Sequence, residues 1–104
     1  MSNKNFGAGF DDLQSTDHFK NLKLTKQNGD EIITLDNIPG KQASVKILYS
    51  IANNSVIGTA EAQRGLALYG NYTEEEKQQP YAHPNIRLLI DVIENNESWT
   101  VTAE

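Results

Sequence analysis

Two runs of alternating apolar and polar residues flank a turn in the first third of the chain. In the first, Leu22 and Leu24 alternate with lysine and threonine, and a second β-type run, residues 32–35, follows Asn28-Gly29-Asp30. Asparagine and glycine tolerate the positive φ that a tight turn requires. The pattern therefore predicts a β-hairpin closed at Asn28-Gly29.

After Pro39-Gly40 the apolar positions change to helical spacing. Ala43, Ile47 and Ile51 recur on one face within residues 41–54, which predicts a helix. The alternative is a strand of period two through Val45, Ile47, Tyr49 and Ile51, which Leu48 and Ala52 fit poorly. A second helix is expected from a cap at Thr59 to about Gly70.

Two more helices and a strand complete the pattern. Thr73 and Glu76 have the spacing of a capping box, so a short helix is expected from Thr73 to Pro80. A longer helix opens at His83-Pro84 and carries a broad apolar face. Residues 98–103 alternate as a strand, with Trp99 and Val101 on one side. Residues 10–13 are expected to form a short helical turn.

These elements predict a single α+β domain. An isolated hairpin is marginal in water, so the C-terminal strand is expected to join the N-terminal hairpin in a small antiparallel sheet, packed against three or four helices. The chain has 104 residues, enough for one hydrophobic core. The expected domain spans residues 9–104, after a flexible N-terminal tail, residues 1–8, and a homodimer is one way to supplement so small a core.

Composition narrows the classes of partner and compartment. The chain has no cysteine, which excludes disulfides and thiolate metal sites and fits a reducing compartment. No apolar run resembles a signal peptide or a membrane span, so a cytoplasmic location is expected. The net charge is −5, with no cluster of lysine or arginine to bind phosphates. Neither nucleic acid nor a membrane is therefore an expected partner.

No strong catalytic motif is present. There is no phosphate-binding glycine loop, nucleophile elbow or paired-histidine metal helix, so no cofactor or metal is expected and the catalytic residues remain unknown. The functional groups concentrate between Glu61 and Arg87. The candidate ligand-binding residues of this stretch are Arg64, Tyr69, Tyr81, His83 and Arg87.

Each of these candidates also has a structural interpretation. His83 could transfer protons, and Arg64 or Arg87 could hold an anion, but a histidine before Pro84 also caps a helix, and tyrosines that flank helices commonly serve packing. His18, beside Asp17, is expected to be a surface or packing residue. The acidic run 74–76 fits a solvated helix start, and Trp99 fits a packing anchor.

Two segments, residues 60–70 (AEAQRGLALYG) and residues 81–89 (YAHPNIRLL), resemble a small family of uncharacterised bacterial proteins of about this length. The resemblance spans nearly the whole chain. It implies a bacterial, cytosolic, single-domain protein, and it supplies no activity and no catalytic residue.

Two functional hypotheses follow. The first is a non-enzymatic cytosolic accessory domain that acts through contacts with a protein partner or with itself, and it expects an exposed apolar patch or a symmetric contact. The alternative is a small-molecule or anion-binding protein, or an enzyme, whose site lies around the five candidate residues. That alternative expects those side chains to converge on one concave pocket.

Overall fold

The computed structural model describes residues 6–29 and 31–104. Its elements, in chain order, are η1 (Phe10–Asp12), β1 (Asn21–Lys26), β2 (Ile32–Asp36), α1 (Gln42–Ile51), β3 (Val56–Ile57), α2 (Thr59–Tyr69), α3 (Asn71–Gln78), α4 (Pro84–Asn95) and β4 (Trp99–Ala103). The predicted α+β class is confirmed, and so are the helical turn, the hairpin strands, the four helices and the C-terminal strand.

The four strands form one antiparallel sheet in the order β2-β1-β4-β3. β1 pairs with β2 across the predicted turn, with Leu24 opposite Ile33, and on its other side β1 pairs with β4, with Leu24 opposite Val101. The C-terminal strand therefore joins the hairpin as predicted. The sequence did not predict β3, because two residues are too few to show an alternating pattern.

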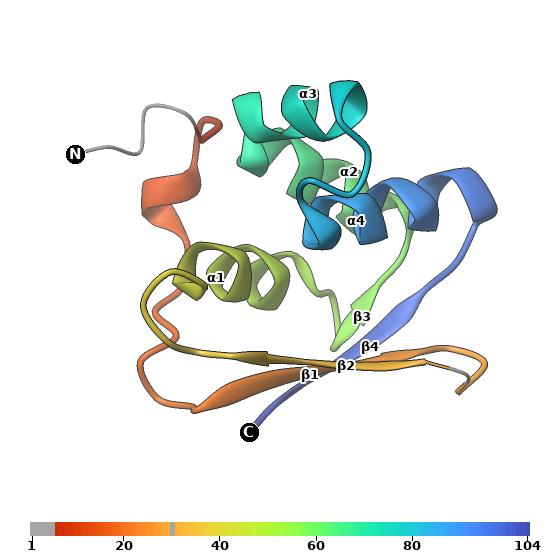
Figure 1. Cartoon of the computed structure of the whole chain (residues 1–104). Coiled ribbons are helices and arrows are strands. Elements are labelled where there is room, and N and C mark those ends of the chain that lie inside the picture. Colours follow the sequence, from red (N-terminus) through yellow and green to blue (C-terminus); the bar gives the residue numbers. More distant parts are fainter. Residues whose placement is uncertain (1–5, 30) are drawn as a thin grey trace.

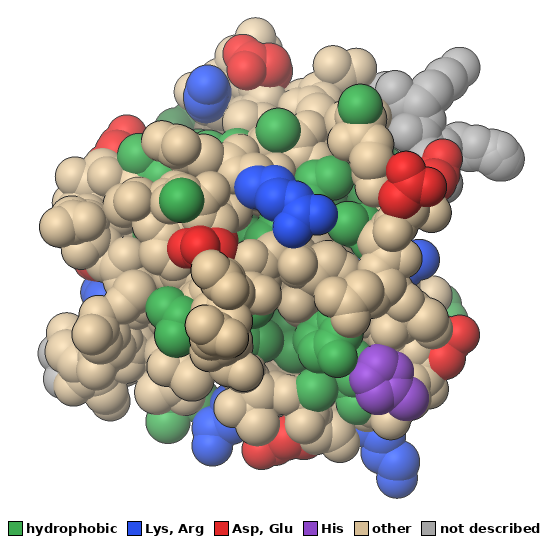
Figure 2. Space-filling model, turned by 180° about the vertical axis from the view of Figure 1, so that it is seen from behind, with side chains coloured by type: hydrophobic (Ala, Val, Ile, Leu, Met, Phe, Trp, Pro, Cys, Tyr) green, Lys and Arg blue, Asp and Glu red, His purple; other side chains and the backbone are tan. Residues whose placement is uncertain are grey.

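All the helices lie on one face of the sheet (Figure 1). α1 contacts β1 and β4, α2 lies against α1 and α4, and α3 forms the layer farthest from the sheet. The opposite face of the sheet is left open, and exposed threonines of β4, Thr100 and Thr102, lie on it. Seen from behind, the molecule shows hydrophobic side chains in separate patches among polar ones (Figure 2).

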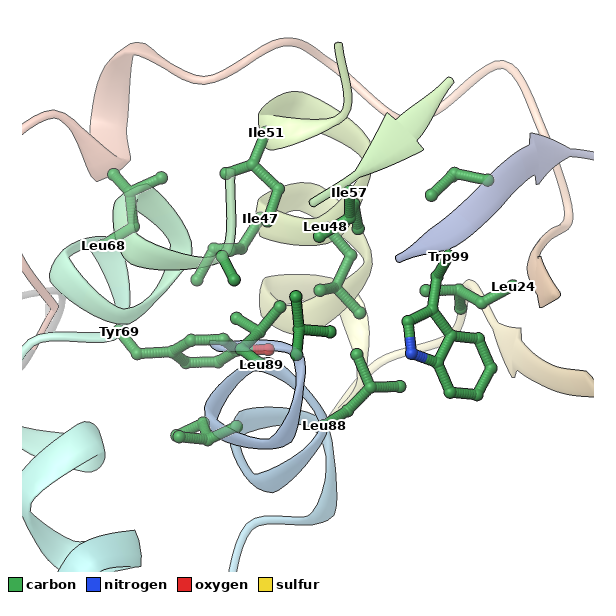
Figure 3. Packing of buried hydrophobic residues seen from close by; sticks show 14 of the residues in the cluster. Leu24, Ile47, Leu48, Ile51, Ile57, Leu68, Tyr69, Leu88, Leu89 and Trp99 are labelled. Carbon is green, nitrogen blue, oxygen red and sulfur yellow. The ribbon is translucent and has the colours of Figure 1, made fainter. Parts of the chain in front are cut away.

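The core lies between the sheet and α1, α2 and α4. Leu24, Ile47 and Leu89 are fully buried there, and Trp99 is 4% exposed. Figure 3 shows Trp99 next to Leu24 of the sheet, with Leu88 of α4 on the side of the indole nitrogen. Trp99 and Val101 are both buried, which confirms that they share the inner face of β4.

One predicted cap is wrong, and part of the predicted tail can be described. Gly58, not Thr59, is the N-cap of α2, and its N–H donates to Oε1 of Glu61 at 2.9 Å. Residues 1–5 of the tail 1–8 lie outside the described residues. Within the remainder, Phe6 packs against the core and the N–H of Gly7 donates to the C=O of Leu68 at 2.8 Å.

Candidate functional site

The junction between α3 and α4 differs from the capping box predicted at Thr73 and Glu76. α3 begins at Asn71, so both residues lie inside the helix. The hydroxyl of Thr73 donates to the C=O of Leu66 at 2.6 Å. It thus provides a hydrogen-bond donor for a carbonyl near the C-terminal end of α2, and does not accept from an N–H in the first turn of α3. The predicted box is therefore wrong, and Glu76 is left for another role.

Glu76 holds the loop that connects α3 with α4. Its side chain is fully buried, and its carboxylate accepts hydrogen bonds from the backbone N–H groups of Tyr81 (2.7 Å) and His83 (2.6 Å) and from Nε of Arg87 (2.7 Å). Burial alone would raise the pKa of Glu76, but these donors outweigh it and hold that pKa below its usual value. The carboxylate is therefore ionised at neutral pH.

This arrangement fixes the directions of three candidate side chains. Tyr81 has a φ of 71°, and its exposed ring lies 5.4 Å from the guanidinium of Arg87. His83 is the N-cap of α4, as its structural interpretation expected, although its ring makes no capping bond. Instead, His83 Nε2 lies 3.0 Å from Oε1 of Glu75. Arg87 is paired with the Glu76 carboxylate through Nε, and its Nη2 lies 3.3 Å from the C=O of Glu76.

Two hollows lie on either side of this loop, and Pro84 borders both. The first, here called the aromatic cavity, has a volume of about 300 Å³ and includes Phe6, Ser44, Tyr69, Tyr72, His83 and Asn85 in its lining. The second, here called the edge groove, has a volume of about 360 Å³ and includes Glu31, Ile33, Arg87, Leu88, Asp91 and Trp99. The edge groove lies between α4 and the hairpin end of the sheet.

The five candidate residues are divided among three places. Tyr69 and His83 line the aromatic cavity, and Tyr81 and Arg87 line the edge groove. Arg64 lies elsewhere, with Nη1 3.4 Å from the C=O of Ser50. The structure thus brings two pairs together and does not gather all five in the one pocket that the alternative hypothesis expected.

His18 and Trp99 take the places that their structural interpretations expected. The ring of His18 lies edge-on to both Phe19 and Tyr49, with centroid distances of 5.0 and 5.8 Å. Trp99 is buried in the core. Its Nε1, however, has no hydrogen-bond partner among the described residues, and the same side chain borders the edge groove.

Acidic groups outnumber free bases in the edge groove. Burial raises the pKa of Asp91. The charge of Arg87 offsets part of this rise, and the charges of Glu94 and Glu97 add to it. Lys26 is paired with Glu97 at 3.1 Å. Within the described part of the chain, neither Asp91 nor Glu31 has a basic side chain within ion-pair distance. The groove therefore presents negative charge around an apolar floor.

The sequence did not identify Glu76, Asp91 or Glu31 as parts of a site. Glu76 and Arg87 are eleven residues apart, so no short spacing links them. The edge groove combines residues from β2, α4 and β4, and only the packing of α4 on the sheet brings these residues together.

Neither a metal centre nor a membrane span is found in residues 6–29 and 31–104. No group of three or more histidine, aspartate or glutamate side chains in this range could hold a metal ion. No helix there is both long enough and apolar enough to cross a bilayer. Figure 2 shows the lysine and arginine side chains of the rear face standing apart from one another, with no continuous basic surface.

Comparison with known proteins identifies a family but no activity. No curated protein matches the chain, and no solved structure does either. A family model described as an uncharacterised protein conserved in bacteria matches residues 6–103. The match confirms the resemblance that the segments 60–70 and 81–89 indicated. The chain therefore belongs to this uncharacterised bacterial family, DUF2322.

Proposed function

We propose that this protein is a non-enzymatic interaction domain of the cytosol that binds an extended segment of another protein along the free edge of β2. The observation that carries the proposal is the position of β2: it is an edge strand of five residues, and the edge groove lies beside it. An unpaired strand edge is a template for another strand, and added strands are a recurrent mode of peptide recognition.

The hydrogen-bonding phase of the hairpin determines which groups are free for a partner. The N–H of Lys26 donates to the C=O of Glu31, and the N–H of Asn37 donates to the C=O of Lys20. In an antiparallel ladder, bonded residues alternate along a strand, so the odd-numbered residues of β2 bond to β1. The backbone N–H and C=O groups of the even-numbered residues, Ile32, Thr34 and Asp36, therefore point away from β1, toward the free edge of the sheet.

Side chains on the inner face of β2 favour an apolar partner residue. Ile33 and Leu35 are only partly buried although they contact the core, because β2 lies at the margin of the helical layer. A strand added beside them would place every second side chain on the same face. One such side chain can reach the floor of the edge groove, which Leu88 and Trp99 form with Ile33.

Charge indicates which segment fits. Glu31, Asp36 and Asp91 lie on or near the free edge, and the chain has a net charge of −5. Opposite charges across an interface favour binding, so an acidic edge favours a basic partner, whereas like charges oppose the binding of an acidic one. The partner that fits is therefore an extended segment that combines apolar residues with lysine or arginine. A second copy of this acidic chain fits less well.

The test is selection of binders from a displayed library of random twelve-residue peptides, followed by affinity measurements on two variants. Thr34→Pro removes the outward N–H at the centre of the edge, and an edge strand tolerates proline at such a position. Thr34→Ser keeps that N–H and serves as the matched control. Circular dichroism and melting curves establish that both variants are folded.

We expect the library to yield apolar peptides rich in lysine or arginine. Their affinity is expected to fall by about tenfold or more in Thr34→Pro and to change less than about twofold in Thr34→Ser. Selection of no binder, or equal affinity for wild type and Thr34→Pro, would contradict the proposal. A concentration-dependent dimer in sedimentation equilibrium that Thr34→Pro abolishes would overturn the identity of the partner, since a second copy would then occupy the edge.

A further inference from the structure

The aromatic cavity lies away from β2, and one of its walls is formed by the segment that precedes η1. The N–H of Gly7 donates to the C=O of Leu68 at 2.8 Å, and a Cβ added to Gly7 would lie 1.9 Å from the carbonyl oxygen of Ala67. Only glycine permits so close an approach of two backbones. This contact holds Phe6 at the cavity.

Aromatic rings surround much of the space. The ring of Phe6 stacks on Phe10 at a centroid distance of 4.2 Å and lies 5.1 Å from the ring of Tyr72. The ring of His83 meets Tyr72 edge-on at 5.6 Å. Glu75 holds Nε2 of His83 at 3.0 Å, which fixes the imidazole from the solvent side. Phe6, Tyr72 and His83 therefore offer ring faces and edges to a planar ligand.

A hydroxyl pair adds a polar group to this lining. The hydroxyl of Tyr69 donates to Oγ of Ser44 at 2.8 Å. Burial raises the pKa of Tyr69 far above its usual value, so this hydroxyl remains a donor throughout the physiological range. The hydroxyl of Ser44 has a proton of its own, and no residue in the described ranges accepts it. Ser44 can therefore donate a hydrogen bond to a ligand.

We propose that the aromatic cavity binds a small planar aromatic molecule that carries a hydrogen-bond acceptor, such as a carbonyl or carboxylate oxygen. The ring of the ligand lies against Phe6, Tyr72 and His83, and the acceptor takes the free proton of Ser44. The volume of about 300 Å³ matches the small end of ligand pockets, which combine apolar walls with a few polar groups. This inference does not depend on the proposed strand binding at β2.

The test is an NMR titration of ¹⁵N-labelled protein with three probes: benzamide, benzoate and cyclohexanecarboxamide. The last keeps the acceptor of benzamide but has no aromatic ring. We expect saturable shifts at Gly7, Ser44, Tyr72 and His83 with at least one aromatic probe, and binding about tenfold weaker or more for the saturated amide. No saturable shift with either aromatic probe, or equal affinity for the saturated amide, would overturn the proposal.

Substitutions locate the binding site. Tyr72→Leu removes one ring, and Gly7→Ala pushes the N-terminal segment away from α2, so each is expected to weaken binding of the aromatic probe by about fivefold or more. Ala8→Ser, at an exposed position of the same segment, is the matched control and is expected to bind as wild type does. If Gly7→Ala does not fold, Tyr72→Leu still decides. Unchanged affinity in a folded Tyr72→Leu variant contradicts the assignment.

Discussion

Replacement of Glu76 by glutamine is expected to destabilise the protein strongly, because one carboxylate satisfies three donors. Oε2 accepts from the N–H of Tyr81 and from Nε of Arg87, and Oε1 accepts from the N–H of His83. A glutamine amide can keep one oxygen, but it turns an NH₂ group toward the remaining donor. One buried donor is then unsatisfied and Arg87 loses its counter-charge. Together these losses cost about 3 kcal/mol.

The assay is urea unfolding at pH 7 and at pH 3, with Glu75→Gln as the control. Glu75 is the neighbouring acid in α3, but its side chain is 60% exposed, so its loss is expected to cost less than about 0.5 kcal/mol. The pKa of folded Glu76 lies below the usual 4.5, so the stability that it contributes is complete above that value and is lost as the pH falls through the folded pKa. The difference between wild type and Glu76→Gln is therefore expected to be full at pH 7 and smaller at pH 3.

Two results would refute this reasoning. If Glu76→Gln costs no more than Glu75→Gln at pH 7, the carboxylate does not hold the loop. If the cost of Glu76→Gln is the same at pH 3 as at pH 7, the charge of Glu76 does not contribute to its effect.

Further substitutions test the packing and the helix ends. In Gly65→Ala, the new methyl group meets Leu89 Cδ1 at 2.7 Å and Ile51 Cδ1 at 2.9 Å, so urea unfolding is expected to show a net loss of about 1 kcal/mol despite the better helix propensity of alanine. Asn96, exposed after α4, has a φ of 54°. Asn96→Gly is expected to be neutral or slightly stabilising, whereas Asn96→Val is expected to lower the melting temperature through a loss of about 1–2 kcal/mol, and equal melting of the two variants would contradict the assigned conformation.

Much of the fold could be predicted from local patterns. The Asn-Gly turn, the apolar face of the last helix and the alternation around Trp99 each depend on neighbouring residues, and each indicated the element that the structure contains. The capping box failed because Thr73 and Glu76 have the right spacing but are the third and sixth residues of α3, where the end of α2 and the loop after α3 provide their partners.

The candidate site was less predictable, because it depends on tertiary contacts. From their closeness in the sequence, Tyr69, Tyr81, His83 and Arg87 were assigned to one candidate site. In the structure, Glu76 binds the loop between α3 and α4, and Tyr69 and His83 line the aromatic cavity whereas Tyr81 and Arg87 line the edge groove. The free edge of β2 could not be identified from the sequence, since the strand order that leaves β2 at the margin depends on where β4 and β3 pair.

The most direct test of the proposed strand binding is amide hydrogen exchange along β2, measured by NMR without and with a selected peptide. In the free protein we expect slow exchange for Ile33 and Leu35, which bond to β1, and faster exchange for Ile32, Thr34 and Asp36. A bound peptide is expected to slow the exchange of these three residues. Equal protection of all five amides in the free monomer, or a bound peptide that leaves Thr34 exchanging as before, would contradict the account.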